Sequence, residues 1–229
     1  MIKYSIIIPT YKHFEDCLKP CLESIVATTD LSNVEVIVVA NGCGDDGTHK
    51  YVVEGPFKLI RIEEPVGYTK ATNAGILAAQ GEYVILLNND CQLLTWQNKN
   101  LWIDMLEKPF LEDDKVAVTG PSIVYDDVIN WWHIIFFCVM IKRGAFDQFG
   151  LLDEVFNPGA GEDTDFCVKV QQAGLKIRKV PDHSLQWTYS ANFPIYHSGG
   201  TTFSELPDHL EIHECNKKTL LDRYGNSGG

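Results

Sequence analysis

Three short polar motifs in this chain contain residue types that can perform chemistry. The first, Asn88-Asn89-Asp90, directly follows an apolar run. A carboxylate at the end of a strand can hold Mg²⁺ or Mn²⁺ through oxygen, with phosphate groups filling other coordination positions. The alternative is an ordinary turn, because Asn and Asp favour turns. The motif is therefore a candidate metal site.

The second motif, Gly161-Glu162-Asp163-Thr164-Asp165-Phe166, places three carboxylates within four residues ahead of an apolar helix. Acids favour the start of a helix through its dipole and through capping, which explains one of the three. Crowded carboxylates repel one another, so the pKa of at least one is raised. A site that removes a proton from a hydroxyl group needs such a positioned base.

The third motif is His197-Ser198-Gly199-Gly200. A histidine beside two glycines can be a metal ligand or a phosphate contact, although a lone histidine is more often structural. Gly42, Gly44 and Gly47 form neither the GxGxxG fingerprint nor a P-loop, which argues against a dehydrogenase or a kinase.

Alternating strands and helices in the first half must position these motifs. A compact apolar run predicts a buried strand at residues 4–8, a second buried strand is expected at 34–39, and further short strands at 58–62 and 83–87; helices are expected at 17–26 and 68–80. Such alternation indicates an α/β fold with a mostly parallel central sheet flanked by helices. Ligands of such sheets bind beyond the carboxyl ends of the strands. Pro9-Thr10-Tyr11, the loop from Asn41 and Asn88-Asn89-Asp90 should converge there.

The second half is less regular. We expect strands at 116–119, 136–142 and 177–180, helices at 163–173 and 210–224, and disorder at 226–229, where a longer protein could have been cut. The apolar run 131–141 is shorter than the about 20 residues of a membrane span, so we interpret it as core.

Composition limits the class of protein. With 229 residues and 45% hydrophobic residues the chain suits one domain. The net charge of −12 argues against nucleic-acid binding, but a metal ion can still supply local positive charge for a phosphorylated ligand. Seven cysteines without CxxC spacing favour reduced thiols, and the first residues do not form a signal peptide. These features predict a cytoplasmic protein with no transmembrane segment.

In order along the chain, six segments resemble family 2 glycosyltransferases, which have the GT-A fold. The resemblance covers roughly residues 4–203 and is closest in pattern to the branch with bacterial rhamnosyltransferases. The segments are SIIIPTY at 5–11 with VVANG at 38–42, GYTKATNAG at 67–75, GEY at 81–83 with LLNND at 86–90, KR at 142–143 leading to LDE at 152–154, GEDTDF at 161–166, and YHSGG at 196–200.

The resemblance implies a role for each matching residue. Asp90 and His197 would hold Mn²⁺ or Mg²⁺ against the donor diphosphate, Asp163 would be the general base, and Glu162 would support it or the acceptor. The residues that would contact the nucleotide-sugar donor are Pro9, Thr10, Tyr11, Asn41, Asn73, Asn88 and Asn89.

Three departures from the family pattern matter. Ala40 stands where the family often has Asp, which leaves UDP, dTDP and GDP open as donor nucleotides. Asn88 opens the DXD-like motif and removes one charge, so we expect weaker metal binding. Residues 183–193 look like an insertion, in which Trp187 and Tyr189 are an acceptor platform or a packed loop.

The resemblance therefore implies an inverting hexosyl- or deoxyhexosyltransferase. A nucleotide-sugar-binding half at about 1–125 and an acceptor-binding half at about 126–225 would share one domain. The acceptor would be a glycan or a lipid-linked glycan, the latter placing the enzyme at the inner face of a membrane. The alternatives are a sugar-nucleotide pyrophosphorylase, a non-catalytic sugar-binding module and a processive polymerase.

Overall fold

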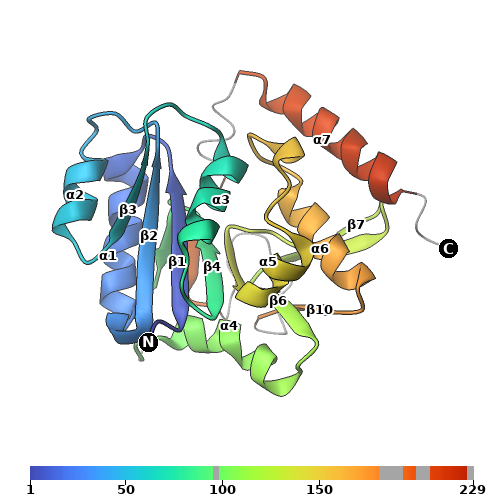
Figure 1. Cartoon of the computed structure of the whole chain (residues 1–229), viewed down its shortest axis with the longest axis horizontal. Coiled ribbons are helices and arrows are strands. Elements are labelled where there is room, and N and C mark those ends of the chain that lie inside the picture. Colours follow the sequence, from blue (N-terminus) through green and yellow to red (C-terminus); the bar gives the residue numbers. More distant parts are fainter. Residues whose placement is uncertain (95–97, 181–192, 200–206, 226–229) are drawn as a thin grey trace.

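A seven-stranded sheet organises the chain. The computed structural model describes residues 1–94, 98–180, 193–199 and 207–225, and within them helices cover both faces of this sheet (Figure 1). In spatial order its strands are β10 (Lys176–Lys179), β6 (Val116–Gly120), β9 (Cys138–Lys142), β4 (Tyr83–Leu87), β1 (Tyr4–Thr10), β2 (Val34–Asn41) and β3 (Lys58–Ile62).

The sheet is mixed but mostly parallel, as the sequence predicts. β1 pairs in parallel with both β2 and β4, β2 with β3, and β6 with β10. Only β9, among the strands of this sheet, is antiparallel to its neighbours β4 and β6. The carboxyl ends of β4, β1 and β2 therefore lie side by side at one edge.

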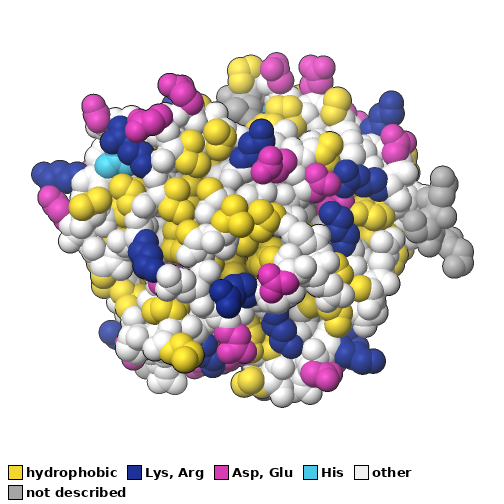
Figure 2. Space-filling model, viewed as in Figure 1, with side chains coloured by type: hydrophobic (Ala, Val, Ile, Leu, Met, Phe, Trp, Pro, Cys, Tyr) yellow, Lys and Arg dark blue, Asp and Glu magenta, His cyan; other side chains and the backbone are white. Residues whose placement is uncertain are grey.

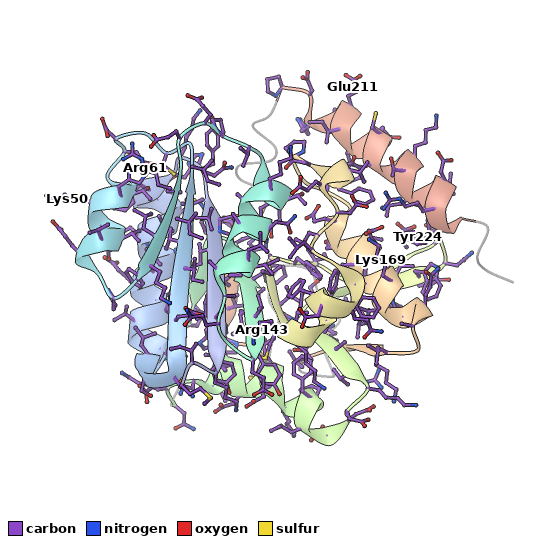
Figure 3. The ribbon with its side chains drawn as sticks, viewed as in Figure 1. Lys50, Arg61, Arg143, Lys169, Glu211 and Tyr224 are labelled. Carbon is purple, nitrogen blue, oxygen red and sulfur yellow. The ribbon has the colours of Figure 1, made fainter. Side chains whose placement is uncertain are left out.

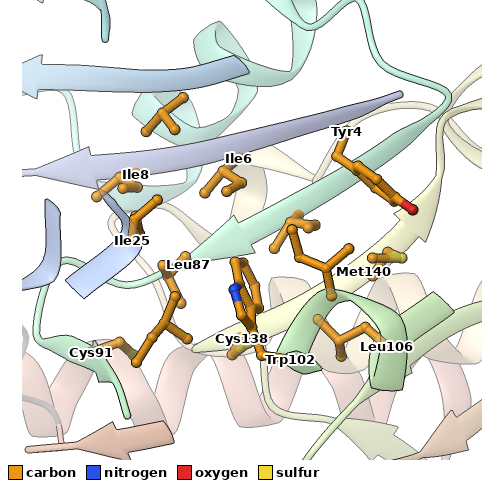
Figure 4. Packing of buried hydrophobic residues seen from close by; sticks show 14 of the residues in the cluster. Tyr4, Ile6, Ile8, Ile25, Leu87, Cys91, Trp102, Leu106, Cys138 and Met140 are labelled. Atoms are coloured by element: carbon orange, nitrogen blue, oxygen red, sulfur yellow. The ribbon is translucent and has the colours of Figure 1, made fainter. Parts of the chain in front are cut away.

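Alternate residues of each strand face opposite layers of helices. Ile6 and Ile8 of β1 pack with α1 (Lys19–Thr28) and with Trp102 and Leu106 of α4 (Leu101–Glu112), as Figure 4 shows. Ile7 packs on the other face with α3 (Tyr68–Ala78), α5 (Arg143–Phe149) and α6 (Glu162–Gln172). Burying both faces explains why β1 is mostly apolar rather than alternating between apolar and polar residues.

The other strands of the described residues form two small antiparallel sheets. β5 (Cys91–Leu93) pairs with β11 (Ile195–His197), and β7 (Ile123–Asp126) pairs with β8 (Trp131–Ile134). The remaining helical elements are η1 (Phe14–Leu18), η2 (Leu31–Asn33), α2 (Thr48–Glu54), η3 (Glu154–Phe156) and α7 (His209–Tyr224).

One contact of α7 with the body of the fold is a small cluster of buried side chains. Leu220 and Tyr224 pack against Ile129, Phe156 and Val168. The helix, red in Figure 1, thereby lies beside α6 and the segment that precedes it.

Several predicted boundaries shift. The expected strand at 136–142 begins at Cys138, and the expected helix at 17–26 becomes η1 followed by α1. The run 131–141 is not one core segment, because it contains β8, a turn and most of β9, with Trp132 exposed. Asn41, expected in a loop, is the last residue of β2.

Some expectations fall on residues that the structure does not describe. Trp187, Tyr189 and the rest of the segment 183–192 lie outside the described residues, as do Gly200 and residues 226–229. Phe193, the last residue of the expected insertion, is buried in the core. Among the described residues no helix has the length and apolarity to cross a bilayer. On the face shown in Figure 2, basic and acidic side chains are interspersed rather than separated into patches.

Candidate active site

A cavity of about 510 Å³ lies at the edge where β4, β1 and β2 end. Two walls of this cavity are formed by parts of the chain that are far apart in sequence. One is formed by the ends of these strands, and the other by the segment that leads into α6. The residues that line it are Pro9, Thr10, Tyr11, Asn41, Pro65, Gly67, Tyr68, Asn88, Asn89, Asp90, Ile135, Phe136, Phe137, Pro158, Gly159, Ala160, Glu162 and Asp163. The structure thus brings together nearly all the site residues predicted from the sequence.

Asp90 is held in place by β11. The residue is 8% exposed, its Oδ1 lies 3.2 Å from Nε2 of His197, and its Oδ2 accepts a hydrogen bond of 3.1 Å from the Ser198 hydroxyl. Pairing of His197 with Cys91 across β11 and β5 fixes this arrangement. Burial alone would raise the pKa of Asp90, but its contact with His197 and the charge of that ring, with the Ser198 bond, lower it. Asp90 is therefore an ionised carboxylate.

The groups around Asp90 fit a divalent cation. Ligand atoms of Asp90, Cys91 and His197 all lie within 4.8 Å of one another. Burial raises the pKa of the Cys91 thiol well above its usual value, so this thiol stays protonated and is a poor ligand. The buried Oδ1 of Asn88, which lines the same cavity, has no hydrogen-bond partner among the described residues. A carboxylate, an imidazole and an amide oxygen suit Mn²⁺ or Mg²⁺.

A second acidic pair stands at the start of α6. Glu162 is 5% exposed, and within the described part of the chain its buried Oε2 has no hydrogen-bond partner. Burial and, secondly, the charge of Asp163 raise the pKa of Glu162 to about 8. Asp163 is less buried, and its Oδ1 accepts a hydrogen bond of 2.7 Å from the Thr164 backbone N–H. Glu162 can therefore hold a proton near neutral pH, while the carboxyl group of Asp163 lines the cavity beside it.

The family of the chain follows from its similarity to known proteins. The model of the family described as Glycosyl transferase family 2 matches residues 5–166, which is more than half of the chain. The chain belongs to this family. The match contains the ends of β1, β2 and β4 and the acidic pair of α6, and it ends before β11 and α7.

Curated relatives of this family 2 chain are distant and mostly much longer. It is 27% identical over 206 residues to the uncharacterized protein y4gI of Sinorhizobium fredii, covering 74% of this chain and 23% of that protein. It is 24% identical over 210 residues to the O-antigen biosynthesis protein RfbC of Myxococcus xanthus, covering 76% and 16%. The chain thus spans less than a quarter of either relative.

Solved structures confirm the GT-A fold that the sequence predicts. The mannosyltransferase PcManGT of Pyrobaculum calidifontis, in complex with GDP-Man and Mn²⁺, aligns with a TM-score of 0.66 at 16% identity, over 95% of this chain and 64% of that one. GalNAc-T7 with UDP, GalNAc and Mn²⁺ aligns with a TM-score of 0.65 at 15% identity, over 97% and 56%. At these identities the likeness establishes the fold alone.

One predicted donor contact of the family 2 chain is wrong in its placement. Asn73 does not line the cavity, because its buried amide bonds both backbone groups of Leu152, accepting from N–H at 3.0 Å and donating to C=O at 2.8 Å. It joins α3 to the segment before η3.

Asn41 does line the cavity, but its Oδ1 accepts a hydrogen bond from the Val66 N–H at 2.8 Å. Its amide therefore shapes the wall.

Asp165 is the structural member of the three acids. Its carboxylate does not line the cavity and is 1% exposed. It accepts hydrogen bonds from Arg223 at 2.7 Å and from the Tyr224 hydroxyl at 2.6 Å, and its other oxygen lies 2.6 Å from Nζ of Lys169. Figure 3 shows Lys169 and Tyr224 at the junction of α6 and α7. This carboxylate therefore ties α7 to α6.

Several lining residues were not singled out from the sequence. Tyr68 lies within the GYTKATNAG segment, so the family pattern contained a signal for it. Ile135, Phe136 and Phe137 belong to an apolar run that we expected in the core, and aromatic residues in such a run carry no local mark of a binding wall. Pro158, Gly159 and Ala160 stand just before the acidic motif, where their turn-forming composition was a usable signal.

Proposed function

We propose that this chain transfers a sugar, with inversion, from a nucleoside-diphosphate sugar to a hydroxyl group of a glycan or lipid-linked glycan. The observation that carries the proposal is that two acidic sites line one cavity. Asp90, paired with His197, supplies a site for a cation and a diphosphate, and the pair of Glu162 and Asp163 supplies a base. Neither a pyrophosphorylase nor a sugar-binding module needs both.

The donor lies on the wall made by the first half of the chain. Thr10 accepts a hydrogen bond of 2.9 Å from Asn89, so the ends of β1 and β4 form one continuous surface for the nucleotide, with Pro9 and Tyr11 beside it. Asp90, His197 and the Oδ1 of Asn88 would hold the cation. When bound there, Mn²⁺ or Mg²⁺ neutralises the charge that develops on the leaving diphosphate.

The acceptor is activated on the wall made by the second half. Asp163 takes the proton of the acceptor hydroxyl as its oxygen attacks the anomeric carbon. The new bond joins acceptor oxygen to sugar, the bond from the anomeric carbon to the phosphate oxygen breaks, and the nucleoside diphosphate leaves. Glu162, protonated because its pKa is raised, adds no second negative charge beside Asp163 and can donate a hydrogen bond to the acceptor.

The relatives support a polysaccharide or glycolipid product. RfbC takes part in O-antigen biosynthesis, and PcManGT binds GDP-Man with Mn²⁺. We include hexoses and deoxyhexoses such as rhamnose, linked to UDP, dTDP or GDP. We also infer that residues to about 125 bind the donor and residues from about 126 bind the acceptor. A lipid-linked acceptor would bring the protein to the inner face of a membrane.

A donor screen with three matched variants tests the proposal. Binding of UDP-, dTDP- and GDP-sugars is measured by calorimetry with and without Mn²⁺, and transfer is measured with glycan acceptors. We expect Asp90→Ala to lose the Mn²⁺-dependent part of binding. Asp163→Asn should retain donor affinity within about threefold while kcat falls by about 10²–10⁴-fold. Asp147→Asn, at an exposed position on α5, is the control and should change neither.

Two of the alternatives have their own outcomes. Donor or sugar binding without transfer to any acceptor would favour a binding module, and release of pyrophosphate from a nucleoside triphosphate and a sugar phosphate would favour a pyrophosphorylase. A product that retains the anomeric configuration of the donor would contradict inversion. Normal transfer by Asp163→Asn would show that another group is the base.

A further inference from the structure

The segment before α6 has an unusual backbone. Gly159, Ala160 and Gly161 all have positive φ, at 155°, 72° and 118°. Ala160 is an L-residue with a side chain, so its left-handed conformation is unfavourable unless other contacts hold it. Gly159 and Ala160 line the cavity, and the chain passes directly from Gly161 into Glu162 and Asp163. The position of the acidic pair therefore depends on what holds this segment.

One face of the segment is held by the region that begins α3. The Asn157 side chain donates a hydrogen bond of 2.8 Å to the Val66 carbonyl, and the Tyr68 N–H donates one of 2.8 Å to the Pro158 carbonyl. These bonds fix residues 157 and 158. They do not reach the carbonyls of Gly159 and Ala160.

Those carbonyls are bound by a single side chain on α7. Asn216 is 7% exposed, and its Nδ2 donates to Gly159 O at 2.9 Å and to Ala160 O at 2.8 Å, with Phe156 O at 3.4 Å. An amide nitrogen has two hydrogens, so the two short bonds use both. Asn216 thus supplies the side-chain hydrogen bonds that hold the left-handed part of the segment.

We propose that Asn216 is a positioning residue of the active site, which places the acidic pair of Glu162 and Asp163 by holding the carbonyls of Gly159 and Ala160. The proposal rests on the proposed transferase function for its kinetic consequence, but the contact itself does not. A base displaced by about 1 Å can lower the rate by about 10²-fold, since proton transfer needs close alignment.

α7 has other anchors, so Asn216 can be changed without releasing the helix. Leu220 and Tyr224 are buried against the body of the fold, and Arg223 bonds both Asp153 at 2.8 Å and Asp165 at 2.7 Å. These contacts lie toward the C-terminal end of the helix from Asn216. Loosening that is confined to residues 157–162 can therefore be distinguished from detachment of α7.

The experiment compares Asn216→Asp, which keeps the shape and removes both donors, with Asn216→Leu, which removes them without adding charge. Lys217→Leu, at an exposed neighbouring position, is the control. Amide hydrogen exchange of the whole chain is followed beside donor binding and transfer kinetics. Both Asn216 variants should exchange at least about tenfold faster at 157–162 with residues 220–224 unchanged. Their kcat should fall about 10²-fold while donor Kd stays within about threefold.

Three results would overturn the proposal. Exchange at 157–162 could stay at the wild-type rate, exchange could rise equally over the whole of α7, or kcat could remain within twofold of the Lys217→Leu value. If the wild-type protein transfers no sugar at all, the transferase proposal fails, and the exchange pattern alone then decides whether Asn216 holds the segment.

Discussion

Replacing Asp165 by Asn should destabilise the protein strongly, although the site residue Asp163 is only two positions away. Asp165 is 1% exposed, whereas the side chains of its partners Lys169 and Arg223 are 31% and 34% exposed. Removing one partner of a buried ion pair costs about 3–5 kcal/mol. The two cations regain water, and Asn keeps one acceptor oxygen, so we place the loss in the free energy of unfolding at about 2–4 kcal/mol.

Urea unfolding and thermal melting measure this loss. For a chain of this size about 1 kcal/mol corresponds to about 2–4 °C, so a loss of about 3 kcal/mol lowers Tm by about 6–12 °C. The matched control is Asp153→Asn, which weakens a bond to the same Arg223 at a carboxylate whose side chain is 31% exposed, and should cost about 1 kcal/mol or less. Equal losses of stability in the two variants would refute the reasoning. They would mean that the buried ion pairs of Asp165 stabilise the fold no more than the partly exposed ion pair of Asp153.

Two further predictions concern the cavity walls. Because the pKa of Glu162 is raised from 4.5 to about 8, the folded protein holds a proton there that the unfolded chain has released, so this group lowers stability as pH rises between these values. The stability of the wild type relative to Glu162→Gln should therefore fall by about 1–3 kcal/mol between about pH 5.5 and about pH 7.5 in urea titrations, and a constant difference would contradict the raised pKa. Gly67 has φ of 89°, and a Cβ there would lie 2.7 Å from Cγ of Asn157, so Gly67→Ala should lower stability by about 2–3 kcal/mol and weaken donor binding. The control is Gly174→Ala, where φ is 77° and a Cβ meets no described atom within 4 Å, so the loss of stability should be only about 1 kcal/mol. A similar loss at both positions would show that the clash with Asn157 does not contribute.

The parallel half of the fold is predictable because its signals are local. Residues 4–8 and 34–39 are almost entirely apolar, since β1 and β2 are buried on both faces; the exceptions, Ser5 and Glu35, are buried and bond each other. Their polar continuations, Thr10 and Asn41, then reach the cavity by topology alone. α4 was also predictable, because Trp102, Leu106 and Phe110 recur at helical spacing and are buried, but the sequence prediction did not include it.

The remaining parts depend on contacts between distant residues. β5 and β11 are three residues each, and each is a strand only because it pairs with the other. Asn73 bonds a residue 79 positions away, and Asn216 bonds carbonyls 56 and 57 positions away. An asparagine in a helix looks the same in sequence whether its amide meets water or a buried carbonyl. The family resemblance predicted which residues would meet at the candidate site, but only the folded structure separates the residues that face the cavity from those that hold its walls.

The antiparallel insertion of β9 has a consequence for synthesis of the chain. All five residues of β4 are buried in the finished sheet, between β1 on one side and β9 on the other. While residues beyond β4 are still being added, β4 is an apolar edge strand with unpaired backbone groups, which can recruit a strand of another chain. Translation therefore leaves the nascent protein exposed to aggregation from the emergence of β4 until β9 arrives, and chaperone binding during that interval would protect it.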